Sequence, residues 1–476
     1  MYPRWRILRV LAGLAELSIV STQELPLLRV PGRAPRRLVP GRVGQALSNN
    51  NIALENIQQY TYVLPATIGR QYFEFIWDTG SSDLWVVDTS CQQGDCTSVP
   101  RYSQQLSDTL ISTEQPFKLS YLTGNVEGEV IHDTVRLGEY QVQSQALATV
   151  YQVADLDLAS TATSGIAGFC FPASAAIPAT VGPTLLENLL SAFPPDQQFF
   201  AFLLPRDGST GSLTLGTLDP TLAPDPTLIN YSPVIRTGSE YDYWKLPLQH
   251  LTVDGQPFPI SPSRVPGAAT PICVLDTGTT LILGPTEDVK AFYAPFGAAA
   301  RNDPVNGYQI RCTRAVPVAL ILGGHEYPLH PADVAWAEGA QDGWCTGGLQ
   351  ANDNVNAGDW LCGDTFLRNV LAVHKYSTTQ PSIGLLSVTN ITIAMQEFRA
   401  ERGEDVADGD TVGQDDSDVA PMEDGNDGWD TTVGYVKRWE HHPNGKAARM
   451  FGAAAGSLGF VVGGITAAGW RFWRGV

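Results

Sequence analysis

The tripeptide Asp-Thr-Gly occurs twice in the chain, at residues 78–80 and 276–278, and paired carboxylates of this kind could perform acid–base chemistry. Each copy follows a largely apolar run, residues 73–77 or 272–275, which is typical of a buried strand. Each copy also supplies the glycine of a turn. If the two half-sites face each other, one carboxyl of the pair Asp78 and Asp276 could donate a proton while the other accepts one.

The internal repeat extends beyond the two tripeptides. An apolar-apolar-Gly element follows each aspartate by about ninety residues, at 166–168 and at 361–363. Repetition at about two hundred residues per copy indicates duplication into two lobes. A single Asp-Thr-Gly is usually an ordinary turn after a strand, but two copies with matched flanks and matched downstream glycines favour a functional pair.

The composition limits both the fold and the partners. The 476 residues include 46 glycines and 33 prolines, and only 17% are charged, which favours short strands joined by turns over long amphipathic helices. The formal net charge of −19 makes nucleic acid an unsuitable partner, because nucleic acid requires a basic surface. The carboxylates of such an acidic chain repel one another less as the pH falls, which suits an acidic workplace.

The seven cysteines cannot all pair within one chain. Cys91 and Cys96 enclose a short loop, and Cys312 and Cys345 could close a longer one. The other three lie in apolar, strand-like runs, and we expect them to be buried free thiols: Cys170, Cys273 and Cys362. The sequence contains no Cys-x-x-Cys or His-Glu-x-x-His motif and predicts neither a metal site nor a cofactor.

The N-terminal residues precede the repeated part and differ from it. Residues 1–21 have a basic start and an apolar stretch, which predicts a signal peptide; a short signal anchor or a wrongly chosen start codon are the alternatives. Residues 22–57 form a basic arm rich in proline and glycine that could lie across an acidic cleft like a propeptide. The alternative for this arm is a disordered linker.

The strand-like region divides into two predicted lobes, residues 58–232 and 233–392. In the first lobe a hairpin is expected over 117–130, with its turn at 122–124 and with Gly124 supplying a positive φ. A short helix is expected over 184–192, because its leucines share one face.

The C-terminal part is predicted to consist of two segments. Residues 393–449 are rich in Asp, Glu and Gly and predict an acidic disordered spacer. Residues 450–476 include an uncharged run, 451–470, long enough to span a membrane as a helix. A cleaved lipid-anchor signal, an irregular tail and a gene-model error are the alternatives. Two sequons near the lobe boundaries make Asn230 and Asn390 glycosylation candidates.

Five motifs together resemble the pepsin-like aspartic peptidases, especially those secreted by fungi, over residues 60–387. They are residues 78–86 (DTGSSDLWV), 121–124 (YLTG), 211–216 (GSLTLG), 276–279 (DTGT) and 360–368 (WLCGDTFLR). The resemblance implies an all-β, bilobal fold, in which two β-rich lobes flank a deep active-site cleft. It also implies the disulfides Cys91–Cys96 and Cys312–Cys345.

By this resemblance, Asp78 and Asp276 are the catalytic residues of an endopeptidase that acts at acidic pH. Two adjacent carboxyls cannot both ionise easily, so they share one proton and titrate as a pair. The ionised member activates a water molecule, and the protonated member polarises the scissile carbonyl and later helps to protonate the leaving nitrogen. A sugar-cleaving carboxylate pair is the enzymatic rival, but it needs a wider separation and lacks duplicated glycine loops.

The resemblance also assigns supporting roles. The residues around the two acids are Thr79, Gly80, Ser81, Thr277, Gly278 and Thr279. The glycines let backbone N–H groups approach the carboxylates, the two threonines of the tripeptides brace the loops, and the hydroxyls that follow donate to an outer carboxylate oxygen. The flap that would close over the substrate contains Tyr121, Thr123 and Gly124, and Trp85 would anchor the Tyr121 hydroxyl.

Several positions depart from the family pattern. Ser164 replaces an acidic residue, Leu122 replaces the flap glycine, and Cys362 replaces an aliphatic residue. The propeptide of the family often covers the catalytic acids with a lysine, but the first lysine of this chain is Lys118, so the N-terminal arm has none. A catalytically silent module that binds peptides or proteins is therefore the alternative function. The expected partners are extended protein or peptide substrates, bound by a monomer of the secretory pathway, either extracellular, at the cell surface or vacuolar, with attachment to a membrane through residues 450–476.

Overall fold

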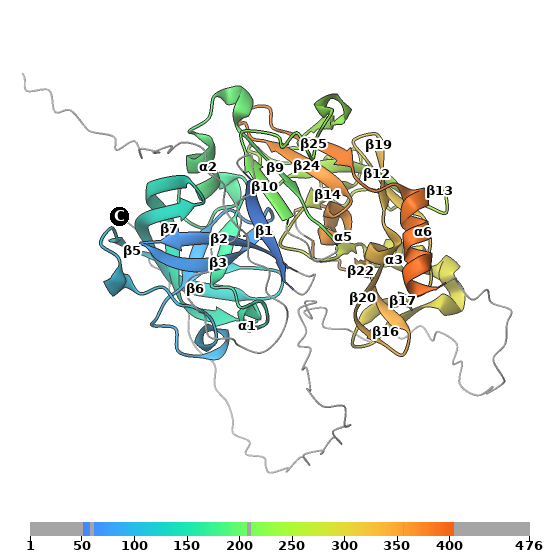
Figure 1. The fold of residues 1–476 in the computed structure, drawn as a ribbon, viewed down its shortest axis with the longest axis horizontal. Coiled ribbons are helices and arrows are strands. Elements are labelled where there is room, and N and C mark those ends of the chain that lie inside the picture. Colours follow the sequence, from blue (N-terminus) through green and yellow to red (C-terminus); the bar gives the residue numbers. More distant parts are fainter. Residues whose placement is uncertain (1–50, 58–60, 207–210, 356, 404–476) are drawn as a thin grey trace, which may run out of the picture. The chain divides into compact units, whose positions relative to one another are not determined.

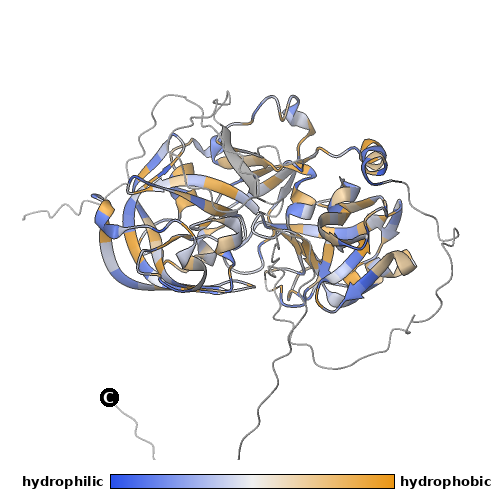
Figure 2. Cartoon of the chain, turned by 60° about the horizontal axis from the view of Figure 1, so that its bottom comes forward, coloured by the Kyte–Doolittle hydropathy of each residue, from blue (hydrophilic) through white to orange (hydrophobic). Residues whose placement is uncertain are grey.

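The computed structural model describes residues 51–57, 61–206, 211–355 and 357–403. These residues form three β-sheets with a few short helices, which confirms the all-β, bilobal fold class (Figure 1). Hydrophobic and hydrophilic residues alternate along many strands (Figure 2), as expected for sheets with one face against a core. The signal-peptide segment 1–21 and most of the basic arm lie outside the described residues.

The largest sheet has thirteen strands and contains strands of both halves of the sequence. In sheet order its strands are β11 (Asn230–Pro233), β25 (Ser382–Ser387), β24 (Val370–Lys375), β9 (Phe199–Leu203), β10 (Gly211–Leu215), β1 (Asn51–Ile57), β2 (Thr61–Ile68), β3 (Gln71–Asp78), β8 (Gly165–Gly168), β4 (Leu84–Val87), β7 (Tyr140–Ala154), β6 (Asn125–Leu137) and β5 (Ile111–Ser120). The antiparallel pairing of β24 with β9 joins the two halves through one sheet.

The other two sheets belong to the second half of the sequence. One has the order β19 (His325–Leu329), β18 (Val318–Leu322), β12 (Lys245–Val253), β14 (Ile272–Leu275), β23 (Trp360–Cys362), β15 (Ile282–Gly284) and β22 (Leu349–Ala351), and β13 (Gln256–Phe258) pairs with β12. The other has the order β16 (Ala300–Asp303), β17 (Gly307–Arg311), β21 (Trp344–Gly347) and β20 (Ala335–Gln341).

The internal repeat of the sequence is visible in the strand pairings. β3 pairs in parallel with β8, in a register that sets Asp78 opposite Gly168. β14 likewise pairs in parallel with β23, with Leu275 opposite Cys362. The next strand of each half, β4 or β15, pairs antiparallel with the same partner. Each Asp-Thr-Gly therefore lies at the end of the same three-strand arrangement.

The helices are short except for the last one. They are α1 (Leu158–Thr161), α2 (Leu185–Leu190), α3 (Thr286–Tyr293), α4 (Pro331–Val334), α5 (Asp364–Leu367) and α6 (Ile391–Arg402), with 3₁₀ turns at Gly94–Thr97, Gln104–Leu106, Pro172–Ser174, Pro195–Gln197, Pro226–Leu228 and Ala294–Ala299. The helix predicted over 184–192 is α2. Thr184 and Glu187 form a capping box at its start, and its leucines are buried.

Two predictions about the ends of the folded region were wrong. Residues 51–57 were expected in the unstructured arm, yet they form β1, which pairs with both β10 and β2 and so completes a ladder that would otherwise have open edges. The disordered spacer was expected from residue 393, yet α6 continues to Arg402. Ala394 and Phe398, four residues apart, form its buried face.

The rest of the tail lies outside the described residues, including the apolar run 451–470. Among the described residues, no helix is both long enough and apolar enough to cross a membrane.

The hairpin predicted over 117–130 is formed by β5 and β6. Its turn is closed by a hydrogen bond from the Tyr121 N–H to the Gly124 carbonyl (2.7 Å). Gly124 does not have the expected positive φ. A Cβ at this position would instead lie 2.2 Å from the Ala154 carbonyl oxygen, so the close approach of β7 is what requires glycine here.

The described residues contain three disulfides. Cys91–Cys96 and Cys312–Cys345 join the cysteines that the family resemblance pairs. The third joins Cys273 to Cys362, which were predicted to be free thiols. That prediction was wrong because β14 and β23 are adjacent and place the two Cα atoms 6.1 Å apart, within disulfide range. Cys170 is free and buried, as expected.

Candidate active site

The two aspartates of the tripeptides lie against each other. Asp78 ends β3, Asp276 follows β14, and both side chains are more than nine-tenths buried. A Cβ placed on Gly80 would lie 2.5 Å from Asp276 Oδ1, and one placed on Gly278 would lie 2.5 Å from Asp78 Oδ1. Each carboxyl therefore sits over the glycine loop of the other half, beside the other carboxyl.

Asp78 receives hydrogen bonds at both of its oxygens. The Gly80 N–H donates to Oδ1 (2.7 Å), and the Ser81 hydroxyl donates to Oδ2. Burial and the neighbouring Asp276 carboxylate raise the pKa of Asp78 well above its ordinary value, and the two donors only partly oppose this shift. A carboxyl in this setting keeps its proton to a higher pH than an exposed aspartate does.

Asp276 has the matching set of donors. The Gly278 N–H donates to Oδ1 (2.8 Å), and the Thr279 hydroxyl donates to Oδ2 (2.7 Å). The two half-sites thus have the same hydrogen-bond pattern, built from corresponding positions. Together the donors fix the orientation of both carboxyls while leaving them in contact with each other.

The two loops are braced by the threonines of the tripeptides. The Thr79 N–H donates to Thr277 Oγ1 and the Thr277 N–H donates to Thr79 Oγ1, each over 3.0 Å. The Thr79 hydroxyl then donates to the Leu275 carbonyl (3.0 Å), and the Thr277 hydroxyl donates to the Trp77 carbonyl (2.8 Å). This reciprocal set ties the end of each strand to the opposite loop.

The predicted flap residues lie at the tip of the β5–β6 hairpin. The indole N–H of Trp85 donates to the Tyr121 hydroxyl (2.7 Å), and Tyr121 packs in the same apolar cluster as Trp85. Burial and the nearby Asp78 raise the pKa of Tyr121, so its hydroxyl stays protonated. Thr123 and Gly124 complete the turn, and the side chain of Leu122 is 48% exposed.

Comparison with known proteins assigns this arrangement to a family. The family model for eukaryotic aspartyl protease matches residues 61–388. The chain belongs to the eukaryotic aspartyl protease family. It is an aspartic-type endopeptidase, and its substrates are proteins or peptides.

Relatives of this aspartyl protease occur in fungi and mammals. It is 27% identical over 356 residues to major aspartyl peptidase 1 of Cryptococcus neoformans var. grubii, a match that covers 71% of each chain. It is 26% identical over 408 residues to pepsin A of Canis lupus familiaris, covering 81% of this chain and 100% of that protein. It is 31% identical over 320 residues to an aspartic protease of Phaffia rhodozyma, covering 65% and 72%.

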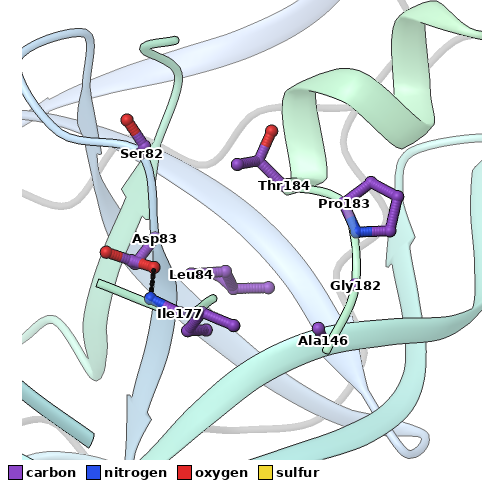
Figure 3. Close-up of a pocket in the computed structure, with 8 residues that line it drawn as sticks. All are labelled: Ser82, Asp83, Leu84, Ala146, Ile177, Gly182, Pro183 and Thr184. Carbon is purple, nitrogen blue, oxygen red and sulfur yellow. Dashed lines mark hydrogen bonds between the residues drawn. The ribbon is translucent and has the colours of Figure 1, made fainter. Parts of the chain in front are cut away.

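Asp83 is a structural residue that sequence reasoning passed over. Its carboxylate accepts hydrogen bonds from the backbone N–H groups of Ala176 (2.7 Å) and Ile177 (2.9 Å), the second of which is drawn in Figure 3. It borders a cavity of about 10 Å³, roughly the size of one water molecule, so this cavity cannot hold a peptide. Asp83 therefore anchors the chain that follows β8 beside the first Asp-Thr-Gly loop.

The glycosylation candidates have different surroundings. Asn230 lies in β11, is half-buried, and interacts with the Tyr327 side chain. Asn390 is exposed, and its carboxamide oxygen caps α6 by accepting from the Thr392 and Ile393 N–H groups. A glycan would be attached to the amide nitrogen, which takes no part in these cap bonds.

Ser164, one of the departures from the family pattern, is held by backbone hydrogen bonds. Ser164 is wholly buried, and its backbone bonds to Glu74 and Val87. Its hydroxyl has no hydrogen-bond partner in the described part of the chain. Within the described ranges, no group of three His, Cys, Asp or Glu side chains could hold a metal ion.

Proposed function

We propose that this aspartyl protease hydrolyses internal peptide bonds of proteins at acidic pH, with Asp78 and Asp276 as its catalytic residues. The observation that carries the proposal is the reciprocal seating of each carboxyl over the glycine loop of the other half. Two carboxyls held in contact share one proton, because ionising both would place like charges together in a buried site.

The reaction uses the two protonation states of the pair. The ionised carboxyl takes a proton from a water molecule, which attacks the scissile carbonyl carbon, while the protonated carboxyl donates a hydrogen bond to the carbonyl oxygen. The tetrahedral intermediate collapses as a proton passes to the leaving nitrogen. The N–H and hydroxyl donors of Gly80, Ser81, Gly278 and Thr279 keep both carboxyls aimed throughout.

The flap completes the site in this proposal. An extended peptide binds through its main chain, and the β5–β6 hairpin closes over it and limits access of bulk water. The Trp85–Tyr121 hydrogen bond supports this role, since it fixes the ring of Tyr121 beside Asp78. Leu122, exposed at the tip, adds an apolar contact where relatives of the pepsin type have glycine.

The test is hydrolysis of a denatured protein at about pH 3–5, with products identified by mass spectrometry. We expect endoproteolytic fragments, and we expect a peptide that mimics the tetrahedral transition state to abolish their formation. Binding of an extended peptide without any turnover by correctly processed protein would instead identify a catalytically silent peptide-binding module.

The chain ends are assigned functions as part of the same proposal. Residues 1–21 direct the chain to the secretory pathway, and the arm beyond them restrains the zymogen until it is cleaved. Three disulfides in the described residues support an oxidising compartment. N-terminal sequencing and intact mass of the purified protein test these assignments; a mature protein that still begins at Met1 would contradict both.

A truncation tests the role assigned to the C-terminal tail, membrane attachment through residues 450–476. A chain that ends at Gly403 keeps α6, and we expect it to retain peptidase activity while it no longer fractionates with membranes. Equal fractionation of the full and shortened chains would exclude an anchor.

A further inference from the structure

Asn369 is a buried polar residue that joins several elements of the second lobe. It follows α5 and its side chain is wholly inaccessible. Its carboxamide oxygen accepts from the backbone N–H of His330 (2.8 Å), from Arg206 Nη2 (3.0 Å) and from the Thr389 hydroxyl (2.6 Å). Its amide nitrogen donates to Asp333 Oδ2 (2.9 Å) and to the Thr365 carbonyl (2.9 Å).

The chemistry of these partners requires an asparagine. The His330 N–H and the Arg206 guanidinium can only donate, whereas the Thr365 carbonyl can only accept, so one side of the residue 369 side chain must accept and the other must donate. An aspartate would keep the acceptor but lose both donors, and an apolar side chain would remove all five of these hydrogen bonds. The arrangement therefore depends on the residue type as well as on packing.

One end of this arrangement reaches the second catalytic loop. The N–H groups of Asp364 and Thr365 in the first turn of α5 donate to the carbonyls of Thr279 and Thr280, each over 2.9 Å. The Thr279 hydroxyl in turn donates to Asp276 Oδ2 (2.7 Å). The position of α5 thus sets the position of the hydroxyl that orients Asp276.

The other end reaches the connection between the lobes. Arg206, just after β9, forms a bidentate ion pair with Asp333, whose side chain is buried. Arg368 lies 3.7 Å from Asp333 and donates to the Tyr62 hydroxyl (2.9 Å) on β2 of the first lobe. Asn369 hydrogen-bonds two members of this cluster directly, Arg206 and Asp333.

A third connection comes from the C-terminal helix. Thr389 lies just beyond residue 388, where the family match ends, and is followed by α6. The helix packs through the buried Phe398, Glu397 lies 3.6 Å from His330, and Arg402 donates to the Ala335 carbonyl. The Thr389 hydroxyl is the side-chain group by which this extension meets Asn369.

We propose that Asn369 is a positioning residue for Asp276, which couples the C-terminal extension at Thr389 and the interlobe residue Arg206 to the loop that carries the Thr279 hydroxyl. The inference rests on the catalytic role proposed above for Asp276. Weakening the side-chain hydrogen bonds of Asn369 tilts α5 and weakens the hydrogen bond from Thr279 to Asp276. This change lowers the rate of the chemical step and leaves substrate binding largely intact.

The test compares matched variants per titrated active site. Thr389→Val removes one donor to Asn369, Thr389→Ser keeps it, and Asn369→Ala removes all five side-chain hydrogen bonds of Asn369. A tight-binding peptide inhibitor counts competent sites, so misfolded protein does not enter kcat. Because one lost hydrogen bond is worth about fivefold in an equilibrium, we expect kcat to fall about threefold to tenfold in Thr389→Val, with KM nearly unchanged and Thr389→Ser close to wild type.

The pH profile separates positioning from mere stability. A hydroxyl donating to an ionised carboxyl favours the ionised form, so a weaker Thr279 bond moves the acid limb of kcat to higher pH in Thr389→Val. Wild-type kcat and acid limb in Thr389→Val would overturn the inference, even if Asn369→Ala fails to fold. An inactive wild-type protein would instead contradict the proposed function.

Discussion

At the scale of single residues, the site depends on donors that occupy corresponding positions in the two repeated stretches of the chain. Ser81 and Thr279 each follow their aspartate by three residues and bind its outer oxygen. The structure places Thr79, Gly80, Thr277 and Gly278 in the remaining contacts expected from the sequence. The catalytic roles of all these residues remain predictions that kinetics can test.

Replacing Ser81 tests the effect of a single donor. In Ser81→Ala the Asp78 carboxyl loses a bond that opposes its raised pKa, so we expect both limbs of the activity profile to move to higher pH. We also expect kcat to fall by about tenfold or more, as when an oriented donor is removed from an active site. Kinetics from about pH 2 to 7 measures both effects. Unchanged limbs would contradict the role of Ser81.

The Trp85–Tyr121 hydrogen bond offers a second test at this scale. Trp85→Phe and Tyr121→Phe each remove the same bond from opposite sides. We expect each to lower kcat/KM about threefold to tenfold, and we expect the double variant to be no worse than the more damaged single variant, because the bond is lost only once. Fully additive losses would show that the two residues act independently.

At the scale of elements, β24 and β9 meet in a stack of buried rings that includes His374. His374 of β24 stacks on Phe200 of β9 at 4.7 Å, and Trp244 contacts it edge-on at 4.7 Å. Neither ring nitrogen of His374 has a hydrogen-bond partner in the part of the chain that the structure describes. Burial lowers the pKa of His374 to about 3 from an ordinary 6.5.

This buried histidine should make the fold less stable in acid. Above pH 6.5 both folded and unfolded chains hold His374 neutral; between pH 6.5 and about 3 only the unfolded chain binds the proton, so folding loses stability as the pH falls through this window. In His374→Phe we expect this loss to shrink by up to about 5 kcal/mol. Urea unfolding at several pH values measures it, with the exposed His325→Phe as control. A parallel pH dependence in wild type and His374→Phe would refute this account.

The helix α6 is the second element with a measurable contribution. Phe398 is wholly buried against α4 and the core, whereas Ile393 on the same helix is 51% exposed. We expect Phe398→Ala to lower the free energy of unfolding by about 3–5 kcal/mol and Ile393→Ala to change it by less than about 1 kcal/mol. Chemical denaturation of the two variants provides the comparison. Equal small effects would mean that α6 does not pack on the lobe in solution.

At the scale of the whole molecule, the duplicated pattern predicted two lobes and the pair of aspartates that meet, and the family resemblance predicted the all-β, bilobal fold class. The apolar strands before Asp78 and Asp276 and the glycines at 168 and 363 are local signals, and both halves carry them. The contacts missed were those between segments far apart in sequence. The Cys273–Cys362 disulfide forms because β14 lies beside β23. Strand β1 forms because it pairs with β10 on one side and with β2 on the other.

Two further misses have the same physical origin. The acidic composition that begins near residue 397 concealed Phe398, whose burial depends on a partner surface provided by α4. Asn369 carries no motif of its own, and its five side-chain hydrogen bonds come from four segments that only the folded chain brings together. Sequence patterns report local periodicity, so they do not identify a buried polar residue such as Asn369, whose partners lie far away in the sequence.

The most direct test of the central claim is the activity of the two carboxyl variants, Asp78→Asn and Asp276→Asn, in correctly folded and processed protein. An amide keeps the shape of the side chain but cannot share the proton, so we expect either substitution to reduce kcat at about pH 4 by a factor of roughly a thousand or more. Unchanged thermal unfolding would confirm that the fold is intact. If either variant kept activity within about tenfold of the wild type, two carboxyls acting as one unit could not be the source of catalysis.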